Sequence, residues 1–276
     1  MEKGKVTVKD ILAMKNNRRI TMLTAYDYPL ASLIDRAGID IILVGDSVAN
    51  VVLGLDSTTQ VGMTEMLHHS KAVTRAVKHS LVIGDMPYES YQVDPGESVK
   101  NAFRFINEAG CDAVKLEWFD KCIEVTAQII NAGIAVMGHI GLTPQTADKI
   151  GGFKVQGKDA ETARRLIRQA NDLQAQGCFS IVLECVPDKI ARMITEGLNI
   201  PTIGIGAGAG CDGQVLVTHD LLGLFERFKP KFVKQYINLA PEIQKAIEEY
   251  KKEVLDGQFP TPAHSFTIKD EELEKL

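Results

Sequence analysis

The sequence Ile41-Ile42-Leu43-Val44-Gly45-Asp46 is a short apolar run that ends in an acid. Four further runs, at 81–85, 113–117, 135–139 and 181–184, end in an acid or a histidine, and each precedes a stretch typical of a helix. Strands that alternate with helices form a parallel sheet, and in a closed parallel barrel the ligand site is built from the carboxyl ends of many strands. The five runs therefore predict an active site.

The same alternation extends over most of the chain and predicts eight strands. Strands are expected at about 20–26, 40–46, 81–86, 113–117, 135–139, 180–185, 202–206 and 213–217. Helices are expected near 8–15, 29–37, 64–78, 96–109, 120–132, 159–176 and 188–197. Left-handed glycine caps are predicted at the ends of five helices, at Gly38, Gly110, Gly133, Gly177 and Gly197. This pattern favours an α/β fold, a (β/α)8 TIM barrel, over an open doubly wound sheet, because the candidate functional residues are spread over so many strands.

Length and composition favour a single barrel domain that spans residues 1–276. The chain has 276 residues, 45% of them hydrophobic, and a barrel of this kind needs about 250 residues. An additional C-terminal helix is expected at 241–256, and its apolar face could pack on the chain's own barrel or on a neighbouring subunit. That face consists of Ile243, Ile247, Tyr250 and Val254. The charged tail at 267–276 is expected to be mobile.

The charge pattern argues against two classes of partner. The net charge is −5, and the Lys and Arg residues are scattered, so we expect no nucleic-acid partner and no membrane partner. No apolar run approaches the roughly 20 residues that span a bilayer.

The five cysteines have no C-x-x-C spacing and are expected to be reduced core thiols, which indicates a cytoplasmic enzyme with small-molecule substrates.

Three strand ends carry carboxylates, at Asp46, Asp85 and Glu117. Hard oxygen ligands of this kind suit Mg²⁺, whose remaining octahedral positions are left for water or substrate oxygens. The structural alternative is that each acid caps a helix or pairs with a buried lysine. Because three acids each follow a buried strand, a metal site is the better interpretation.

Three further strand-end residues supply charge or proton transfer. Lys115 and Glu117 point to the same face of their strand, where a cation could hold a substrate carboxylate or simply pair with the acid. Glu184 lies among apolar residues that disfavour its ionised form, which suits a general base, although a paired structural role is the alternative. His139 is flanked by glycines and could donate to an oxyanion, although a lone histidine is more often structural.

Several motifs resemble the ketopantoate hydroxymethyltransferase family, and the resemblance covers nearly the whole chain. They are Thr24-Ala25-Tyr26-Asp27, Val44-Gly45-Asp46-Ser47, Asp56-Ser57-Thr58, Gly138-His139-Ile140-Gly141-Leu142-Thr143-Pro144-Gln145, Lys154-Val155-Gln156-Gly157, Leu183-Glu184-Cys185-Val186-Pro187, Gly204-Ile205-Gly206-Ala207-Gly208 and His264-Ser265-Phe266. The resemblance implies a (β/α)8 barrel of the phosphoenolpyruvate mutase and isocitrate lyase superfamily. It also implies Mg²⁺ as cofactor, 5,10-methylenetetrahydrofolate as co-substrate and a homo-oligomer, commonly a decamer.

The resemblance also implies roles for individual residues. Asp46 and Asp85 would bind Mg²⁺ and line the substrate site, with Glu117 completing the metal site directly or through water. Ser47 and Lys115 would hold the keto acid. By the same resemblance His139 would line the substrate pocket, and Glu184 would be the base.

The implied reaction transfers a hydroxymethyl group from 5,10-methylenetetrahydrofolate to 3-methyl-2-oxobutanoate, giving ketopantoate and tetrahydrofolate for pantothenate synthesis. One rival is a carbon–carbon lyase of the same superfamily, which usually carries a Lys-Lys-Cys-Gly-type loop that this sequence lacks. The other rival is a barrel that binds a keto acid without catalysis. Two departures from the family pattern, Trp118-Phe119 for Gly-Gly and Val48-Ala49-Asn50 for a Leu-Gly-Met type of sequence, concern local loop shape.

Overall fold

Eight parallel strands pair in sequence order, and the last strand pairs with the first to close a barrel. The computed structural model describes residues 4–146 and 154–276. The strands are β1 Ile20–Thr24, β2 Ile41–Val44, β3 Leu81–Asp85, β4 Ala113–Glu117, β5 Val136–Gly141, β6 Ser180–Glu184, β7 Thr202–Ile205 and β8 Gly213–Leu216. The predicted TIM barrel is confirmed, and the open doubly wound sheet is wrong because no strand edge is left unpaired in the ring.

Strands β2, β3 and β4 are buried on both faces, and alternate residues build two separate cores. On β2, Ile41 and Leu43 belong to the core inside the barrel, whereas Ile42 and Val44 belong to the core between strands and helices. This is why the strand reads as an unbroken apolar run rather than an alternating one. Side chains alternate between the two faces of a strand, so a residue lies in the barrel interior when it is two or four positions from another interior residue of the same strand.

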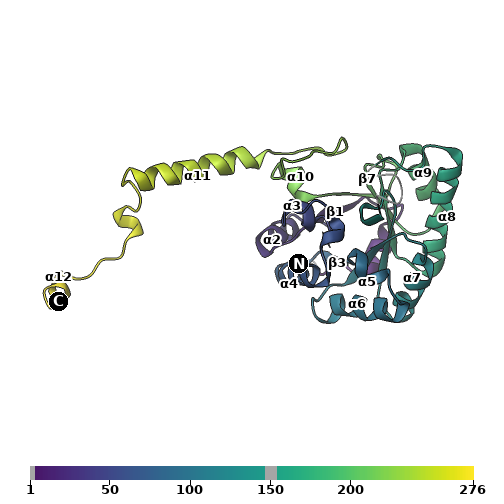
Figure 1. Ribbon diagram of the computed structural model, residues 1–276, viewed down its shortest axis with the longest axis horizontal. Coiled ribbons are helices and arrows are strands. Elements are labelled where there is room, and N and C mark those ends of the chain that lie inside the picture. The colour runs from purple at the N-terminus through teal and green to yellow at the C-terminus, as the bar shows by residue number, and fades with distance from the viewer. Residues whose placement is uncertain (1–3, 147–153) are drawn as a thin grey trace. The chain divides into compact units, whose positions relative to one another are not determined.

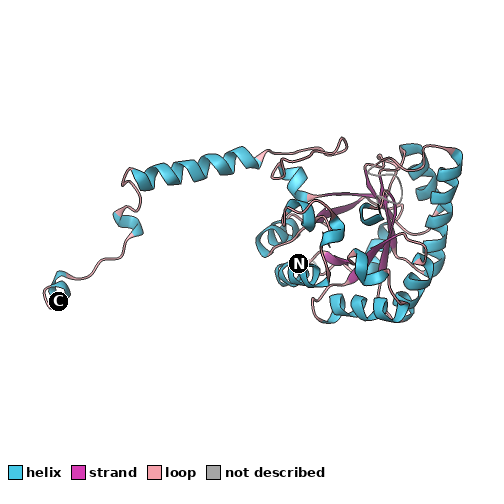
Figure 2. Ribbon diagram, in the orientation of Figure 1, coloured by secondary structure: helices cyan, strands magenta, loops and turns pink. Residues whose placement is uncertain are grey.

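Helices surround the barrel, and Figures 1 and 2 show α4, α6, α7 and α8 outside the strands. The seven predicted helices are present as α1 Val8–Met14, α2 Tyr28–Arg36, α4 Met63–Ala76, α6 Pro95–Asn107, α7 Cys122–Asn131, α8 Ala160–Gln176 and α9 Asp188–Gly197. Local chemistry sets their starts: Asp27 caps α2 by accepting from the Leu30 N–H at 2.8 Å, with Pro29 in the first turn. Short helices that the sequence did not predict, α3 Val48–Val51, η1 Thr58–Gln60 and α5 Tyr88–Tyr91, lie in the loops after β2 and β3.

Four of the five predicted glycine caps are confirmed. Gly38, Gly110, Gly133 and Gly177 have positive φ angles between 75° and 99°. The prediction at Gly197 is wrong, because this residue is still helical and α9 ends at Leu198 in an extended conformation. The chain enters the segment before β7 directly there, so no left-handed turn is needed.

The chain divides into two compact units, and the barrel is the larger one, residues 1–218 with 230–233. The second unit comprises 219–229 and 234–276 and contains most of α10 Thr218–Leu222, together with α11 Leu239–Leu255, η3 Pro262–His264 and α12 Asp270–Leu273. The predicted C-terminal helix is therefore confirmed as α11, and the four residues of its predicted apolar face are exposed by 43% to 61%. Within the described ranges, no helix combines the length and apolar character needed to cross a membrane.

Candidate active site

Strand alternation directs five polar side chains into the barrel near the carboxyl ends of the strands. On β3, Ile83 packs in the inner core, so Asp85 points to the same interior. By the same alternation, the inner-core residues Ala113, Met137 and Val182 show which residues of β4, β5 and β6 point inward. The five interior polar residues are Asp85, Lys115, Glu117, His139 and Glu184. The side chains of the first four are at most 4% exposed, and that of Glu184 is 16% exposed. The prediction that Lys115 and Glu117 share the interior face is confirmed.

Asp85 and Lys115 form a buried ion pair. They are register partners on β3 and β4, and Lys115 Nζ lies 2.8 Å from Asp85 Oδ1. Burial raises the pKa of Asp85, Lys115 opposes the rise, and the nearby charge of Asp46 adds to it, so the pKa of Asp85 stands at about 7. Burial opposes the charge on Lys115, but the three surrounding acids outweigh burial and raise the pKa of this ammonium group. The site therefore carries more negative charge than one lysine compensates.

Asp46 follows the end of β2 and joins this group through its backbone. It is 7% exposed, and its N–H donates to Asp85 Oδ2 at 3.1 Å. Ser47 follows directly, and its hydroxyl lies 2.8 Å from the hydroxyl of Tyr26, which is fully buried. The loop after β2 thus brings a carboxylate and a hydroxyl to the same end of the barrel as Asp85.

His139 stands between two acids from the neighbouring strands. Its Nδ1 lies 3.4 Å from Glu117 Oε1, and its Nε2 lies 3.2 Å from Glu184 Oε2. Burial and the charge of Lys115 oppose protonation of the ring, but the contacts with Glu117 and Glu184 outweigh them and raise the pKa of His139 to about 9. The raised pKa of His139 favours the protonated ring, and the ring links the two carboxylates.

A glutamine that the sequence did not single out connects the acids across strands. Gln145, in the turn after β5, donates from Nε2 to Asp46 Oδ2 at 2.9 Å and to the Met86 carbonyl at 3.2 Å. Its backbone N–H donates to Glu117 Oε2 at 3.1 Å, and its Oε1 accepts from the hydroxyl of Tyr91. The sequence analysis selected titratable residues at strand ends, and the side-chain amide of Gln145 does not titrate. The one sequence feature that included Gln145 was the family motif that ends in Thr143-Pro144-Gln145.

Comparison with known proteins places the whole chain in one family. The model of the ketopantoate hydroxymethyltransferase family matches residues 5–262. A protein from Syntrophomonas wolfei named 3-methyl-2-oxobutanoate hydroxymethyltransferase is 56% identical over 262 residues, 95% of each chain. One of the same name from Enterococcus faecalis is 52% identical over 276 residues, 100% of each chain. The chain belongs to the ketopantoate hydroxymethyltransferase family. It is accordingly an enzyme of the transferase class.

Solved structures related to this ketopantoate hydroxymethyltransferase family member support the barrel fold. A phosphoenolpyruvate phosphomutase from Streptomyces platensis subsp. rosaceus matches with a TM-score of 0.61 and 16% identity, covering 91% of this chain and 88% of that one. A 2,3-dimethylmalate lyase of the phosphoenolpyruvate mutase and isocitrate lyase superfamily matches with a TM-score of 0.60 and 14% identity, covering 94% and 93%. At these identities the likeness concerns the fold alone.

The acids of this family member fit a divalent cation in their chemistry. Among residues 4–146 and 154–276, no three or more His, Cys, Asp or Glu side chains converge as a ready-made metal cage. Mg²⁺ needs no such cage, since one or two carboxylates usually hold it together with water and substrate oxygens. Asp85 Oδ1 is buried and makes no well-aligned hydrogen bond, and the excess negative charge around it suits a cation. Asp46 and Asp85 are therefore the two acids whose chemistry fits a divalent cation.

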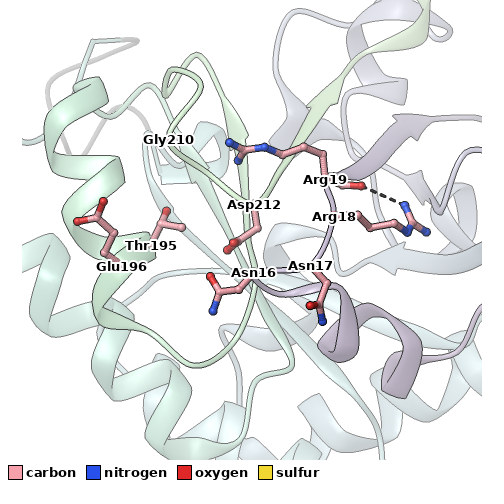
Figure 3. Close-up of a pocket in the computed structure, with 8 residues that line it drawn as sticks. All are labelled: Asn16, Asn17, Arg18, Arg19, Thr195, Glu196, Gly210 and Asp212. Atoms are coloured by element: carbon pink, nitrogen blue, oxygen red, sulfur yellow. Dashed lines mark hydrogen bonds between the residues drawn. The ribbon is translucent and has the colours of Figure 1, made fainter.

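A separate cavity lies at the opposite, amino-terminal end of the barrel (Figure 3). Its volume is about 440 Å³, and its walls come from the segments that precede β1 and β8 and from the end of α9. Arg18 there donates to the Arg19 carbonyl at 3.0 Å and pairs with Asp40. This cavity contains none of the predicted site residues, since those lie at the carboxyl ends of the strands.

Proposed function

We propose that this protein transfers a hydroxymethyl group from 5,10-methylenetetrahydrofolate to 3-methyl-2-oxobutanoate, giving ketopantoate and tetrahydrofolate in pantothenate synthesis. The observation that carries the proposal is the group of Asp46, Asp85, Lys115 and Glu184 at one end of the barrel, in a chain whose relatives bear this enzyme's name over their full length. A 2-keto acid has a carboxylate and a keto oxygen that match such a mixture of cations and acids.

Asp46 and Asp85 would hold Mg²⁺. When bound, Mg²⁺ supplies positive charge that stabilises the negative charge developing on the keto acid as its C3 proton leaves. Both oxygens of Glu117 already have protein partners, Gln145 and His139, which favours a contact with the metal through water rather than a direct one. Lys115 and Ser47 are placed to bind the substrate carboxylate.

Glu184 would take the proton from C3. Its side chain is the least buried of the interior acids, and its Oε2 lies 3.2 Å from His139 Nε2. The C3 carbon then forms a bond to the methylene carbon of the folate, and one of the two carbon–nitrogen bonds of that carbon breaks, leaving its electron pair on the nitrogen, which takes up a proton. Water supplies the hydroxyl oxygen as the remaining carbon–nitrogen bond breaks, and the folate nitrogen takes up a proton.

Proton NMR of 3-methyl-2-oxobutanoate in D₂O tests this reaction in two stages. With purified protein and Mg²⁺ alone, we expect the C3 proton signal to disappear by exchange, and we expect chelation of Mg²⁺ to stop the exchange. Addition of 5,10-methylenetetrahydrofolate should then give ketopantoate. Exchange without product would favour a lyase of the same superfamily, and binding with neither exchange nor product would favour a barrel that only binds the keto acid.

The proposal includes the assembly and compartment expected of the family, a homo-oligomer, commonly a decamer, in the cytoplasm. The five cysteines are all free, which agrees with a reducing compartment. Sedimentation analysis of the full chain measures the assembly directly, since a monomer of 30.3 kDa and a decamer differ tenfold in mass.

A further inference from the structure

The side-chain amide of Gln145 has only one orientation that satisfies its neighbours. Asp46 Oδ2 and the Met86 carbonyl are both acceptors, so the NH₂ group must face them. The amide oxygen then faces Tyr91, whose hydroxyl donates to it. Tyr91 is fully buried, and the ring of Phe119 packs edge-on against it at a centroid distance of 5.3 Å. The amide is therefore held from both ends.

The two aspartates of the site are held by partners of different charge. Asp85 has the ammonium group of Lys115 at 2.8 Å, which compensates its charge. Asp46 instead accepts from the neutral amide of Gln145 at 2.9 Å. A neutral donor fixes the Asp46 carboxylate while leaving its full charge available to a ligand.

We infer that Gln145, itself held by Tyr91, is a positioning residue that orients Asp46 and Glu117 for a divalent cation and the keto acid. The inference rests on the proposed function, because it concerns the metal site proposed there. Gln145 engages one oxygen of Asp46 through its side chain and one oxygen of Glu117 through its backbone, so a single residue positions one acid after β2 and one acid at the end of β4. The oxygen Oδ1 of Asp46 is then the atom left to bind the cation.

Two variants remove this support to different degrees. Gln145→Leu removes the side-chain amide at similar volume, and with it the contacts to Asp46, the Met86 carbonyl and Tyr91, but it keeps the backbone N–H that donates to Glu117. Tyr91→Phe removes only the hydroxyl that holds the amide. Loss of a residue that orients a metal ligand typically weakens metal affinity about 10- to 100-fold. We expect a rise of that size in the Mn²⁺ dissociation constant for Gln145→Leu and a smaller rise for Tyr91→Phe. The double variant should show no more than the loss of Gln145→Leu, because the hydroxyl acts through the amide.

The matched control is Thr195→Val at the other end of the barrel. Thr195 is also buried and its hydroxyl also makes two hydrogen bonds, with the Ala191 carbonyl at 2.8 Å and with Thr202 at 2.7 Å. This variant loses buried hydrogen bonds without touching the acids, so it reports general destabilisation. We expect its Mn²⁺ affinity to equal that of the wild type at a temperature where circular dichroism shows every variant folded.

Electron paramagnetic resonance of free Mn²⁺, titrated with the full chain in the presence of 3-methyl-2-oxobutanoate, measures the dissociation constants. A loss of at least tenfold in Gln145→Leu, with turnover recovering as Mg²⁺ is raised, supports the inference, because added metal compensates for a misplaced ligand but does not repair a damaged fold. If wild type and both variants bind Mn²⁺ within twofold of one another, the positioning role is wrong and the proposed function stands. If the wild type binds no Mn²⁺, the proposed metal site fails, and the inference fails with it. Tyr91→Phe keeps the test decisive should Gln145→Leu not fold.

Discussion

Asp85 and Lys115 are register partners on adjacent strands, and their side chains close a 2.8 Å ion pair inside the barrel. Neither side chain is more than 4% exposed. A buried pair of this kind offers little net stability compared with an apolar pair, but removing one partner leaves an uncompensated charge. The pair therefore makes the site electrostatically sensitive to any change at Lys115.

Replacement of Lys115 by Met is expected to lower the free energy of unfolding by roughly 3–5 kcal/mol and to abolish measurable keto-acid binding. The matched control is Lys15→Met, which breaks the Lys15–Asp212 ion pair at the other end of the barrel. The two charged groups of this pair are 2.9 Å apart, and the side chains of Lys15 and Asp212 are 7% and 9% exposed. Urea unfolding should show a loss of similar size in both variants. Calorimetric binding of 3-methyl-2-oxobutanoate should be lost only in Lys115→Met, and retained binding there would contradict a substrate-holding role.

Replacement of Glu184 by Gln is expected to slow C3 proton exchange by about 10²- to 10⁴-fold, the usual contribution of a positioned base. The amide is nearly isosteric and stays beside His139, so the affinity for the keto acid and for Mg²⁺ should change little. Exchange is followed by proton NMR in D₂O, and Glu196→Gln on the exposed end of α9 serves as control. Loss of keto-acid binding rather than of exchange would assign Glu184 a structural role.

The sequence predicted the strand-end residues because their positions depend on local rules. Asp85 and Glu117 end apolar runs, parity along a strand decides which way each points, and closure of the ring brings all carboxyl ends together. None of these steps requires knowledge of how a loop folds. The same rules explain why Glu184 and His139 could be expected near each other.

Contacts made through loops could not be predicted in this way. Gln145 and Tyr91 meet because the turn after β5 and a four-residue helix after β3 both fold over the end of the barrel. Neither segment has a periodicity that fixes its path, and neither residue carries a charge at neutral pH. The mistaken cap at Gly197 has a similar cause, since a glycine marks a left-handed turn only where the following chain requires one.

The raised pKa of His139 predicts a pH dependence of stability. The folded pKa is about 9 against an ordinary 6.5, so the folded protein holds this proton more tightly, and the added stability is full below pH 6.5 and lost as pH rises through 9. For the metal-free protein we expect the unfolding free energy to fall by about 2 kcal/mol between pH 7.5 and 9.5. Urea unfolding at both pH values checks this, and His139→Gln should show a flatter profile. An equal slope in the variant would assign the dependence to another group.

Gly141 lies against the backbone of Glu184, the proposed base, which is its register partner on β6. Its φ is +100°, and a Cβ there would clash with the Glu184 carbonyl oxygen and lie 2.8 Å from Val186 Cγ2. Gly133 has a comparable φ of +88° but open space around its Cβ position, so Gly133→Ala isolates the cost of the left-handed backbone, roughly 1–2 kcal/mol.

We expect Gly141→Ala to cost clearly more than Gly133→Ala in urea unfolding and to lower C3 exchange, whereas Gly133→Ala keeps full exchange. The reason is that the Leu142 N–H donates to the Glu184 carbonyl at 2.8 Å, so a clash at Gly141 moves the backbone that carries the base. Equal stability losses in the two variants would show that the loop relaxes around the methyl group. Unchanged C3 exchange in Gly141→Ala would show that the position of the Glu184 side chain does not depend on this contact.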